Sequence, residues 1–176
     1  VSAAGSPLTS VPGIFVDNRA GGRLIAEHLL SLGHRNIGIF DGRMSAKPDY
    51  HVWDQRTDGL RDTIREAGFD IDSRNVIQPG DCHAVDGERA MKELLASGRL
   101  FPTAIFCHTD EVAFGAMAAL RAAGLRCPDD VSIASFDDHP MSQWWGLTTV
   151  DQHAHEQGER AAHAMIGALA ADEHNG

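Results

Sequence analysis

Polar side chains that could bind a small molecule follow several short apolar stretches of this sequence. Asp137 and Asp138 come directly after the apolar and β-branched segment 131–136. Corresponding positions after other apolar segments hold Asp41, Cys82, His108 and Thr109. The carboxyl ends of parallel strands meet at one edge of a sheet, where open α/β proteins bind their ligands. These side chains are therefore predicted to line a ligand-binding edge.

The residue types at this edge suit a hydroxyl-rich small molecule. Arg56 carries a planar guanidinium that donates to adjacent hydroxyl groups, and the carboxylate of Asp137 accepts from them. The ring of Trp53 can cover the apolar face of a sugar. Trp53 and Arg56 are expected to come from an irregular polar segment that begins near residue 43. We predict a binding site in which Arg56 and Asp137 form the main polar pair.

Each of these residues also has a structural interpretation. Asp137 could stabilise the fold by accepting hydrogen bonds from nearby backbone amides. Trp53 could fill the edge of the sheet instead of meeting a ligand. A helix N-cap is expected at Thr109 or Asp110; capping is favoured for Asp110, whereas Thr109 could both cap the helix and face the ligand. Cys82 and Cys107 could be plain small apolar residues.

Catalytic and metal chemistry is not indicated. His153 and His155, with Glu156, resemble a metal-binding pattern, but helical residues two positions apart point in different directions, so a solvated face is favoured. The motifs HExxH, GxxxxGKS, GxxxxGKT, GxGxxG and GxSxG are absent from the sequence. No cofactor, metal or enzymatic activity is predicted. A hydrolase that uses Asp137 or His108 is the enzymatic alternative.

The overall charge argues against direct nucleic-acid binding by this sequence. Its 176 residues include 15 Lys and Arg against 25 Asp and Glu, a formal net charge of −10. Nucleic-acid affinity comes mainly from Lys and Arg, so any DNA contact is expected from a segment outside this sequence. The length suits one α/β domain or one and a half lobes of a larger protein. Because Val1 stands where Met would begin a gene product, a fragment is expected.

The cysteines and the hydropathy bear on the compartment. Cys82, Cys107 and Cys127 are widely spaced and form no CxxC pair. This pattern gives no disulfide framework and favours a reducing cytoplasm. No apolar stretch is long enough to cross a membrane.

Alternating strands and amphipathic helices must position these side chains. Strands are predicted at 11–16, 36–40, 74–78, 103–107 and 131–136, and helices at 21–32, 55–67, 84–97, 110–123 and 152–170. In the first helix, apolar spacing is shared by Leu24, Ile25, His28, Leu29 and Leu32. The nearly unbroken apolar strands and the crossover lengths predict an α/β fold, a parallel sheet with helices on both faces.

A series of short motifs runs in order from about residue 11 to residue 166. Its members include Val16-Asp17-Asn18, Gly21-Gly22-Arg23, Leu32-Gly33-His34-Arg35-Asn36-Ile37, Arg56-x-x-Gly59, Asp110-Glu111-Val112-Ala113-Phe114-Gly115, Phe136-Asp137-Asp138 and Leu147-Thr148-Thr149-Val150. Each motif is weak alone. As an ordered series they resemble the regulatory core of the LacI/GalR family of bacterial transcription repressors.

The resemblance implies a two-lobed sensor of the type I periplasmic-binding-protein-like fold. Such a sensor holds a sugar, or sometimes a nucleobase, between its lobes and works as a homodimer. Effector binding shifts the lobes and alters operator binding by an N-terminal helix-turn-helix, which would lie outside this chain. Residues 1–17 would be the end of the N-terminal lobe, 18–150 the C-terminal effector-binding lobe, and 151–176 the crossover and a helix that returns to the N-terminal lobe.

The resemblance also implies roles for particular residues. Arg56 and Asp137 fall where the family contacts its ligand, and Gln152 falls at the lobe crossover. Two positions depart from the family pattern: Thr109 stands where many relatives have Asn, and Cys82 where an aromatic residue is frequent. The effector therefore need not be a common hexose.

A dimer contact is also implied. Trp145 and the helix 110–123 match regions that form this contact in the family, with Phe114 and Met117 as apolar anchors. From their residue type alone, Trp144 and Trp145 could also line the cleft or fill the core; an oligomer contact is favoured for at least one of them.

The predicted function is the effector-sensing region of a cytoplasmic, DNA-binding repressor. A solute-binding protein of a sugar ABC transporter, with the same two-lobed fold, is the main alternative. The two differ in what would precede Val1: a helix-turn-helix in a repressor and an export signal in a transport protein.

Overall fold

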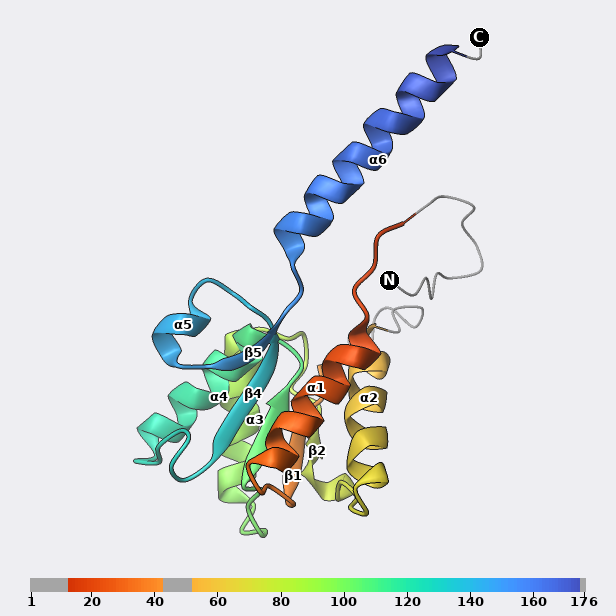
Figure 1. The fold of residues 1–176 in the computed structure, drawn as a ribbon. Coiled ribbons are helices and arrows are strands. Elements are labelled where there is room, and N and C mark those ends of the chain that lie inside the picture. The colour runs from red at the N-terminus through yellow and green to blue at the C-terminus, as the bar shows by residue number, and fades with distance from the viewer. Residues whose placement is uncertain (1–12, 43–51, 175–176) are drawn as a thin grey trace. The chain divides into compact units, whose positions relative to one another are not determined.

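The computed structural model in Figure 1 describes residues 13–42 and 52–174. Internal contacts divide the chain into two compact units. One unit is Asn18–Val150, and the other comprises the described residues outside it, 13–17 and 151–174. The larger unit contains the strand ends that carry the predicted ligand-binding side chains.

A five-stranded sheet in the order β2-β1-β3-β4-β5 forms the centre of the larger unit. Its strands are β1 (Ile37–Phe40), β2 (Val76–Ile77), β3 (Ala104–Cys107), β4 (Ser132–Asp137) and β5 (Thr148–Asp151). β1 pairs in parallel with β2 and β3, and β3 pairs in parallel with β4. All residues of β1 and β3 are buried, as expected for strands covered on both faces.

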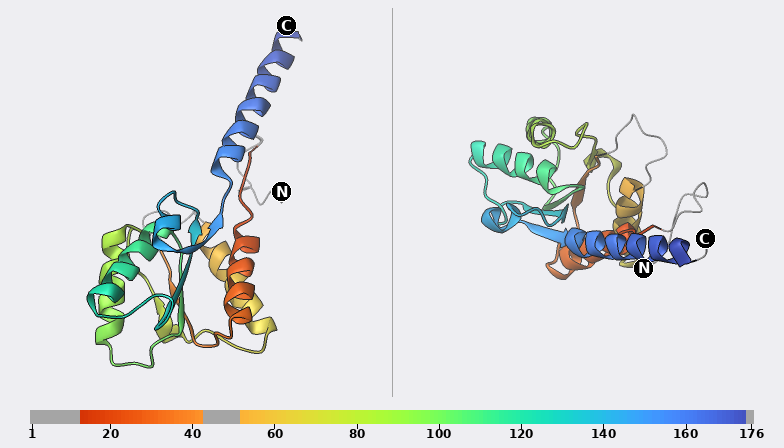
Figure 2. Two further views of the ribbon diagram at one scale, coloured as in Figure 1. Left: turned by 60° about the vertical axis from the view of Figure 1, so that its left-hand side comes forward. Right: turned by 90° about the horizontal axis from the view of Figure 1, so that it is seen from above.

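Helices cover both faces of this sheet (Figure 2). α1 (Asn18–Ser31) packs on α2 (Val52–Glu66) over one face, and α3 (Ala84–Ala96) packs on α4 (Asp110–Ala122) over the other. The 3-10 turn η1 (Ser73–Asn75) precedes β2, and the short helix α5 (Ser142–Trp145) lies between β4 and β5. The smaller unit contains α6 (Ala154–His174). The predicted α/β fold is confirmed.

The central strand β3 sends alternate side chains to the two faces. Ile105 and Cys107 join the apolar core under α3 and α4. Phe106 and His108, two positions apart, lie beside each other, and His108 stacks on Trp53 of α2. The period-2 alternation of a strand therefore places His108 on the α1–α2 face.

Glycines let the helices of each pair approach at the level of their backbones. A Cβ atom on Gly22 of α1 would collide with the backbone carbonyl of Arg56, and one on Gly59 of α2 would collide with the backbone of α1. On the other face, Gly87 of α3 and Gly115 of α4 are restricted in the same way. Only glycine fits such positions. The close backbone contact at Gly22 and Gly59 therefore determines how near α2, which carries Arg56, lies to α1.

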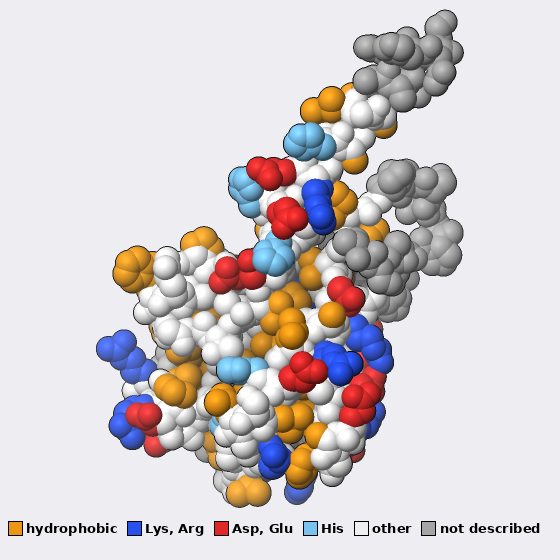
Figure 3. Space-filling view, viewed as in Figure 1, with side chains coloured by type: hydrophobic (Ala, Val, Ile, Leu, Met, Phe, Trp, Pro, Cys, Tyr) orange, Lys and Arg blue, Asp and Glu red, His pale blue; other side chains and the backbone are white. Residues whose placement is uncertain are grey.

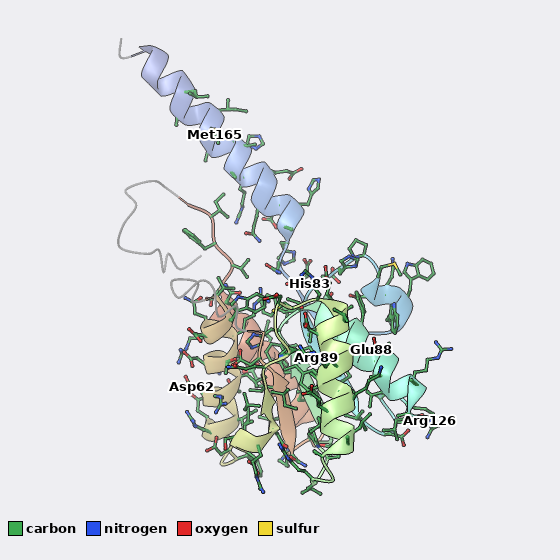
Figure 4. The ribbon with its side chains drawn as sticks, turned by 180° about the vertical axis from the view of Figure 1, so that it is seen from behind. Asp62, His83, Glu88, Arg89, Arg126 and Met165 are labelled. Carbon is green, nitrogen blue, oxygen red and sulfur yellow. The ribbon has the colours of Figure 1, made fainter. Side chains whose placement is uncertain are left out.

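Ion pairs cover the outer faces of the helices. On α3, Lys92 donates to Glu88, which is labelled in Figure 4, at 2.5 Å. Between α1 and α2, Arg19 pairs with Asp62. These four side chains are 42–59% exposed, and exposed pairs contribute little to stability, so packing and not surface charge holds the fold together.

The first predicted strand is wrong where it is described. Residues 13–17 have no regular structure, and residues 11 and 12 lie outside the described part of the chain. The last strand of the sheet, β5, was not among the predicted strands. Its four residues are exposed or half-buried, so it lacks the unbroken apolar pattern of the central strands.

Two helices begin earlier than predicted. α1 begins at Asn18 and not at residue 21, and α2 begins at Val52 and not at residue 55. Trp53 therefore belongs to a helix and not to an irregular segment, and Arg56 lies in the same helix. Asp54 in the first turn of α2 suits the positive end of the helix dipole, a start signal that the polar surroundings obscured.

The apolar spacing in α1 overstated its buried face. Ile25 and Leu29 are buried, but Leu24 and Leu32 are 57% and 60% exposed, and His28 is exposed as well. In α6, Met165 (Figure 4), Ile166 and Leu169 are also exposed. None of the helices in the described part of the chain is both long and apolar enough to span a membrane.

Candidate functional site

Arg56 is the centre of the candidate site. Its side chain projects from α2 and is only 5% exposed. Its Nε donates to Asn18 Oδ1 at 2.9 Å, and its Nη1 donates to the backbone carbonyl of His108 at 2.5 Å. Nη1 also lies 3.5 Å from Asp137 Oδ1. A buried guanidinium is tolerated only when it is paired and hydrogen-bonded, as it is here.

Two aromatic rings fix the plane of the guanidinium. The Cζ atom of Arg56 lies 3.8 Å from the ring centroid of Phe136 and 5.3 Å from that of Trp53. Both distances are typical of cation–π contacts. Gly21 of α1 leaves the space that the Phe136 ring occupies. The guanidinium is therefore held in one orientation by α1, α2 and the end of β4.

Asp137 ends β4 and presents a partly exposed carboxylate. Its side chain is 30% exposed, against 5% for Arg56. The backbone φ angles of Asp137 and Asp138 are 130° and 55°, in the left-handed region that side chains other than glycine rarely adopt. The Asp138 N–H donates to Thr149 Oγ1 at 3.2 Å. This turn brings the Asp137 carboxylate back to Arg56, so the predicted polar pair lies together.

Asp41 and His108 lie beneath the site. Asp41 is 2% exposed and His108 is fully buried, so neither side chain is accessible to a ligand in this structure. The Asp41 Oδ1 lies 3.5 Å from His108 Nδ1, and His108 Nε2 lies 2.8 Å from Thr57 Oγ1. Both side chains are thus buried at the strand ends where the ligand-binding edge was predicted, and contact of Asp41 with a ligand stays a prediction.

Cys82 lies beside the end of β1. It is 9% exposed, its φ is 70°, and its Sγ donates to the carbonyl of Gly42 at 2.8 Å. Burial, followed by the negative charges of Asp86 and Asp81, raises the pKa of the Cys82 thiol to about 11. The thiol is thus protonated and weakly nucleophilic at neutral pH. Burial likewise raises the pKa of Cys107, in agreement with its interpretation as an apolar core residue.

This combination of fold and strand-end residues agrees with the results of sequence comparison. The family model for a periplasmic binding protein-like domain matches residues 26–176. The chain belongs to this family.

Within it, the similar proteins are transcriptional regulators. The HTH-type transcriptional repressor PurR of Haemophilus influenzae is 34% identical over 148 residues, which cover 83% of this chain and 42% of that protein. A LacI family transcriptional regulator from Mycobacterium smegmatis superposes with a TM-score of 0.80 and 28% identity, covering 93% of this chain and 59% of that one. A complex of the transcriptional regulator CelR with cellobiose superposes with a TM-score of 0.81 and 29% sequence identity. The match covers 96% of this chain and 50% of that one.

The resemblance to the effector-binding core of LacI-type regulators is confirmed by these relatives. They are regulators and not enzymes, which agrees with the prediction that this region has no catalytic activity. The chain spans 42% of the length of the PurR relative and 50–59% of the two solved chains.

In this periplasmic binding protein-like domain, Thr109 is the N-cap of α4. Its side chain accepts a hydrogen bond from the Val112 N–H at 3.3 Å. Thr109 is half-buried, so part of its side chain is accessible at the strand end. The capping role predicted for Thr109 is confirmed, and its contact with a ligand stays a prediction.

Asp110 is not the cap but a buried acceptor, which corrects the favoured interpretation. It is 1% exposed. Its Oδ1 accepts from Ser135 Oγ at 2.5 Å and Thr149 Oγ1 at 2.6 Å, and its Oδ2 accepts from Ser142 Oγ at 2.6 Å and the His139 N–H at 2.7 Å. This carboxylate joins α4 to β4, α5 and β5. No local pattern in the sequence marks this role.

Gln152 belongs to the smaller unit, so it is not counted among the side chains gathered here. In the same unit, His153 Nδ1 lies 2.8 Å from Asp151 and His155 Nδ1 lies 3.5 Å from Glu159. The two histidines thus face different carboxylates, but helical spacing is not the reason, since His153 has a φ of 52° and precedes α6.

The residues predicted for a dimer contact lie around α4 and α5. The rings of Phe114 and Trp145 are 5.5 Å apart, and Trp145 is 37% exposed. Trp144 is 78% and Met141 47% exposed, and Figure 3 shows hydrophobic side chains on the edge of the domain that carries α5. Met117, by contrast, is only 8% exposed and packs in the core, so it offers little surface to a partner.

Proposed function

We propose that this chain is the effector-sensing region of a transcriptional repressor and that Arg56 and Asp137 bind a small, hydroxyl-rich effector. The observation that carries the proposal is the immobilised guanidinium of Arg56 beside the accessible carboxylate of Asp137. A donor and an acceptor side by side match the neighbouring hydroxyl groups of a carbohydrate. The relatives of this chain supply the regulatory part of the proposal.

The geometry of Arg56 favours recognition without rearrangement. Its contacts with Asn18, His108 and Phe136 hold the guanidinium in place before an effector arrives. A group that is already ordered loses little conformational entropy on binding, so its hydrogen bonds contribute more to affinity. The cellobiose complex of a structural relative supports a carbohydrate as the effector class; a purine is the second class to test.

Other residues complete the proposed site. Trp53 offers a half-buried ring next to Arg56, and Thr109 offers a hydroxyl at the end of β3. Cys82 contributes a small apolar wall, and Gln152 would contribute from the lobe crossover. Asp41, which lies 3.5 Å from His108 Nδ1, completes the proposed set from the end of β1.

The remaining parts of the proposal concern the whole protein. With a net charge of −10, the chain would bind operator DNA only through another segment. Effector binding would change the arrangement of two lobes and thereby operator affinity, in a cytoplasmic homodimer. Reading the codons upstream of Val1 separates this from the transporter alternative, since a helix-turn-helix supports the repressor and an export signal contradicts it.

A ligand panel tests the site in the full-length gene product. Calorimetry with cellobiose, glucose, galactose, ribose, adenine and hypoxanthine should identify a binder. For that binder, Asp137→Asn and Arg56→Lys should each lower the affinity about 10–100-fold, because each removes a charged hydrogen bond.

The matched control is Arg126→Ala, which removes an exposed cation paired with Asp129 and Asp130. It should leave the affinity unchanged. Equal affinity in the wild type, Asp137→Asn and Arg56→Lys would contradict the site, and a correctly folded protein that binds no member of the panel would contradict the proposed effector classes.

A further inference from the structure

His108 follows β3 directly, yet it cannot meet an effector. The side chain is fully buried on the α1–α2 face of the sheet, beside Phe106 at a ring distance of 5.4 Å. It is the one histidine among the described residues that is fully buried. A large polar ring with no exposed surface needs partners that satisfy it.

The partners of His108 lie on one stripe of α2. The ring stacks on Trp53 with a centroid distance of 5.4 Å and an interplanar angle of 10°. The Nε2 atom lies 2.8 Å from Thr57 Oγ1, and the backbone carbonyl accepts from Arg56 Nη1 at 2.5 Å. Trp53, Arg56 and Thr57 are at i, i+3 and i+4, so they share one face of the helix. The residue directly after β3 therefore contacts the first turns of α2 at three points.

The end of β1 fixes the other side of the ring. Asp41 Oδ1 lies 3.5 Å from His108 Nδ1. The two ring nitrogens therefore face different elements: Nδ1 faces Asp41 after β1, and Nε2 faces Thr57 of α2. The ring thus joins β1, β3 and α2 in one orientation.

We infer that His108 is a positioning residue: by stacking on Trp53 and accepting from Arg56, it sets the two α2 side chains that face the effector, without touching the effector itself. The inference rests on the proposed function for its effect on affinity. Its effect on Trp53 is independent of any ligand. Loss of the imidazole should leave the Trp53 ring without its stacking partner and remove the contact with Thr57 of α2.

Fluorescence of Trp53 tests the positional part directly. The background is the full chain with Trp144→Phe and Trp145→Phe, in which Trp53 is the remaining tryptophan. His108→Ala should raise acrylamide quenching of Trp53 and shift its emission to the red. His108→Phe, which keeps a ring to stack on, should stay near the background protein. Unchanged quenching in a folded His108→Ala protein would overturn the inference.

Affinity for the panel member that the wild type binds tests the consequence. His108→Ala should weaken binding about tenfold, the lower end of the effect of removing outer-shell partners at other sites. Cys107→Ala is the matched control, since Cys107 is the preceding residue, equally buried, but faces α3 and α4. It should leave both affinity and Trp53 quenching unchanged.

Thr57→Val covers the case in which His108→Ala does not fold. Valine is isosteric with threonine and removes only the hydroxyl, so the ring loses one tether while the core stays filled. A folded Thr57→Val protein should bind more weakly than wild type, and unchanged affinity and quenching would count against the inference. If the wild type binds no panel member, the proposed effector classes fail, whereas the quenching result still decides the role of His108.

Discussion

At the scale of single residues, Asp110 shows how one carboxylate can organise a strand-end region. It accepts from Ser135 of β4, Ser142 of α5, Thr149 of β5 and the backbone of His139 in the turn before α5. That turn follows Asp137 and Asp138, whose φ angles are positive. Conformations of this kind cost about 1–3 kcal/mol each and persist when the surroundings hold them. Asp110 contributes to this hold by accepting from the N–H of His139, directly after these two residues.

Replacing Asp110 with Asn should destabilise the domain by about 2–3 kcal/mol, because the amide nitrogen would face two donors and leave them unsatisfied in a buried site. Urea denaturation followed by circular dichroism measures the loss. The adjacent Glu111→Gln is the control, since that side chain is 55% exposed and its change should stay within about 0.5 kcal/mol. Similar stabilities of the two variants would show that the Asp110 network is not important for folding.

Residue types predicted part of the site and missed the rest. Arg56 and Asp137 were recognisable because their residue types suit hydrogen bonds to a hydroxyl-rich ligand and because Asp137 directly follows an apolar strand. The hydrogen bonds of Asp110 to Ser135 and Thr149 span 25 and 39 residues, so no local pattern reveals them. The burial of Asp41 and His108 depends on the direction of one side chain after each strand, which tertiary packing decides.

At the scale of helices, the backbone contact between α1 and α2 determines where Arg56 can reach. The carbonyl of Arg56 itself lies against Gly22, and Asn18 at the start of α1 accepts from its Nε. Site and packing thus share the same residues. A change that separates the two helices should lower stability and effector affinity together.

Gly22→Ala tests this coupling. The added methyl group meets the Arg56 carbonyl, and such overpacking costs about 1–3 kcal/mol. The melting temperature should fall, and binding of the panel effector should weaken with it.

Gly158→Ala in α6 is the control of opposite sign. Apart from the backbone of its own helix, no atom lies within 4 Å of its Cβ position, and alanine is the better helix former, so stability should stay equal or rise. A Gly22→Ala protein with wild-type stability and affinity would contradict the proposed dependence of the site on close packing.

Helix and strand types were predictable from periodicity, but their ends were less so. Buried strands such as β1 and β3 are continuous apolar runs, which made them clear. The start of α2 at Val52 was hidden because Val52 and Trp53 follow a polar stretch of sequence and are followed by Asp54 and Gln55. β5 was missed because it is exposed or half-buried along its length, so its residues do not form an apolar run.

At the scale of the whole molecule, the surface formed by Phe114, Met141, Trp144 and Trp145 is the proposed dimer contact. Aromatic residues and methionine are enriched in interfaces, and Trp144 is largely exposed. The Phe114–Trp145 ring contact gives this surface a rigid base. Met117 lies behind it in the core and would support the contact only indirectly.

Trp144→Glu in the full-length gene product should raise the dimer dissociation constant about 10–100-fold, as expected when a charged residue replaces an aromatic anchor. Sedimentation velocity over a concentration series measures this change. Leu100→Glu, at a site that is 83% exposed on another part of the surface, should have no effect. An unchanged dissociation constant for Trp144→Glu would place the dimer contact elsewhere.

The burial of the Arg56 side chain, which is only 5% exposed, has a consequence for the conditions under which such a sensor works. Dissolved ions screen exposed charges strongly and buried charges weakly. An uncharged metabolite held by Arg56 and Asp137 should thus bind almost independently of ionic strength. Repressor binding to DNA, in contrast, falls steeply as salt rises. A change in ionic strength inside the cell would therefore alter the affinity of the repressor for its operator, while its affinity for the metabolite stayed nearly constant.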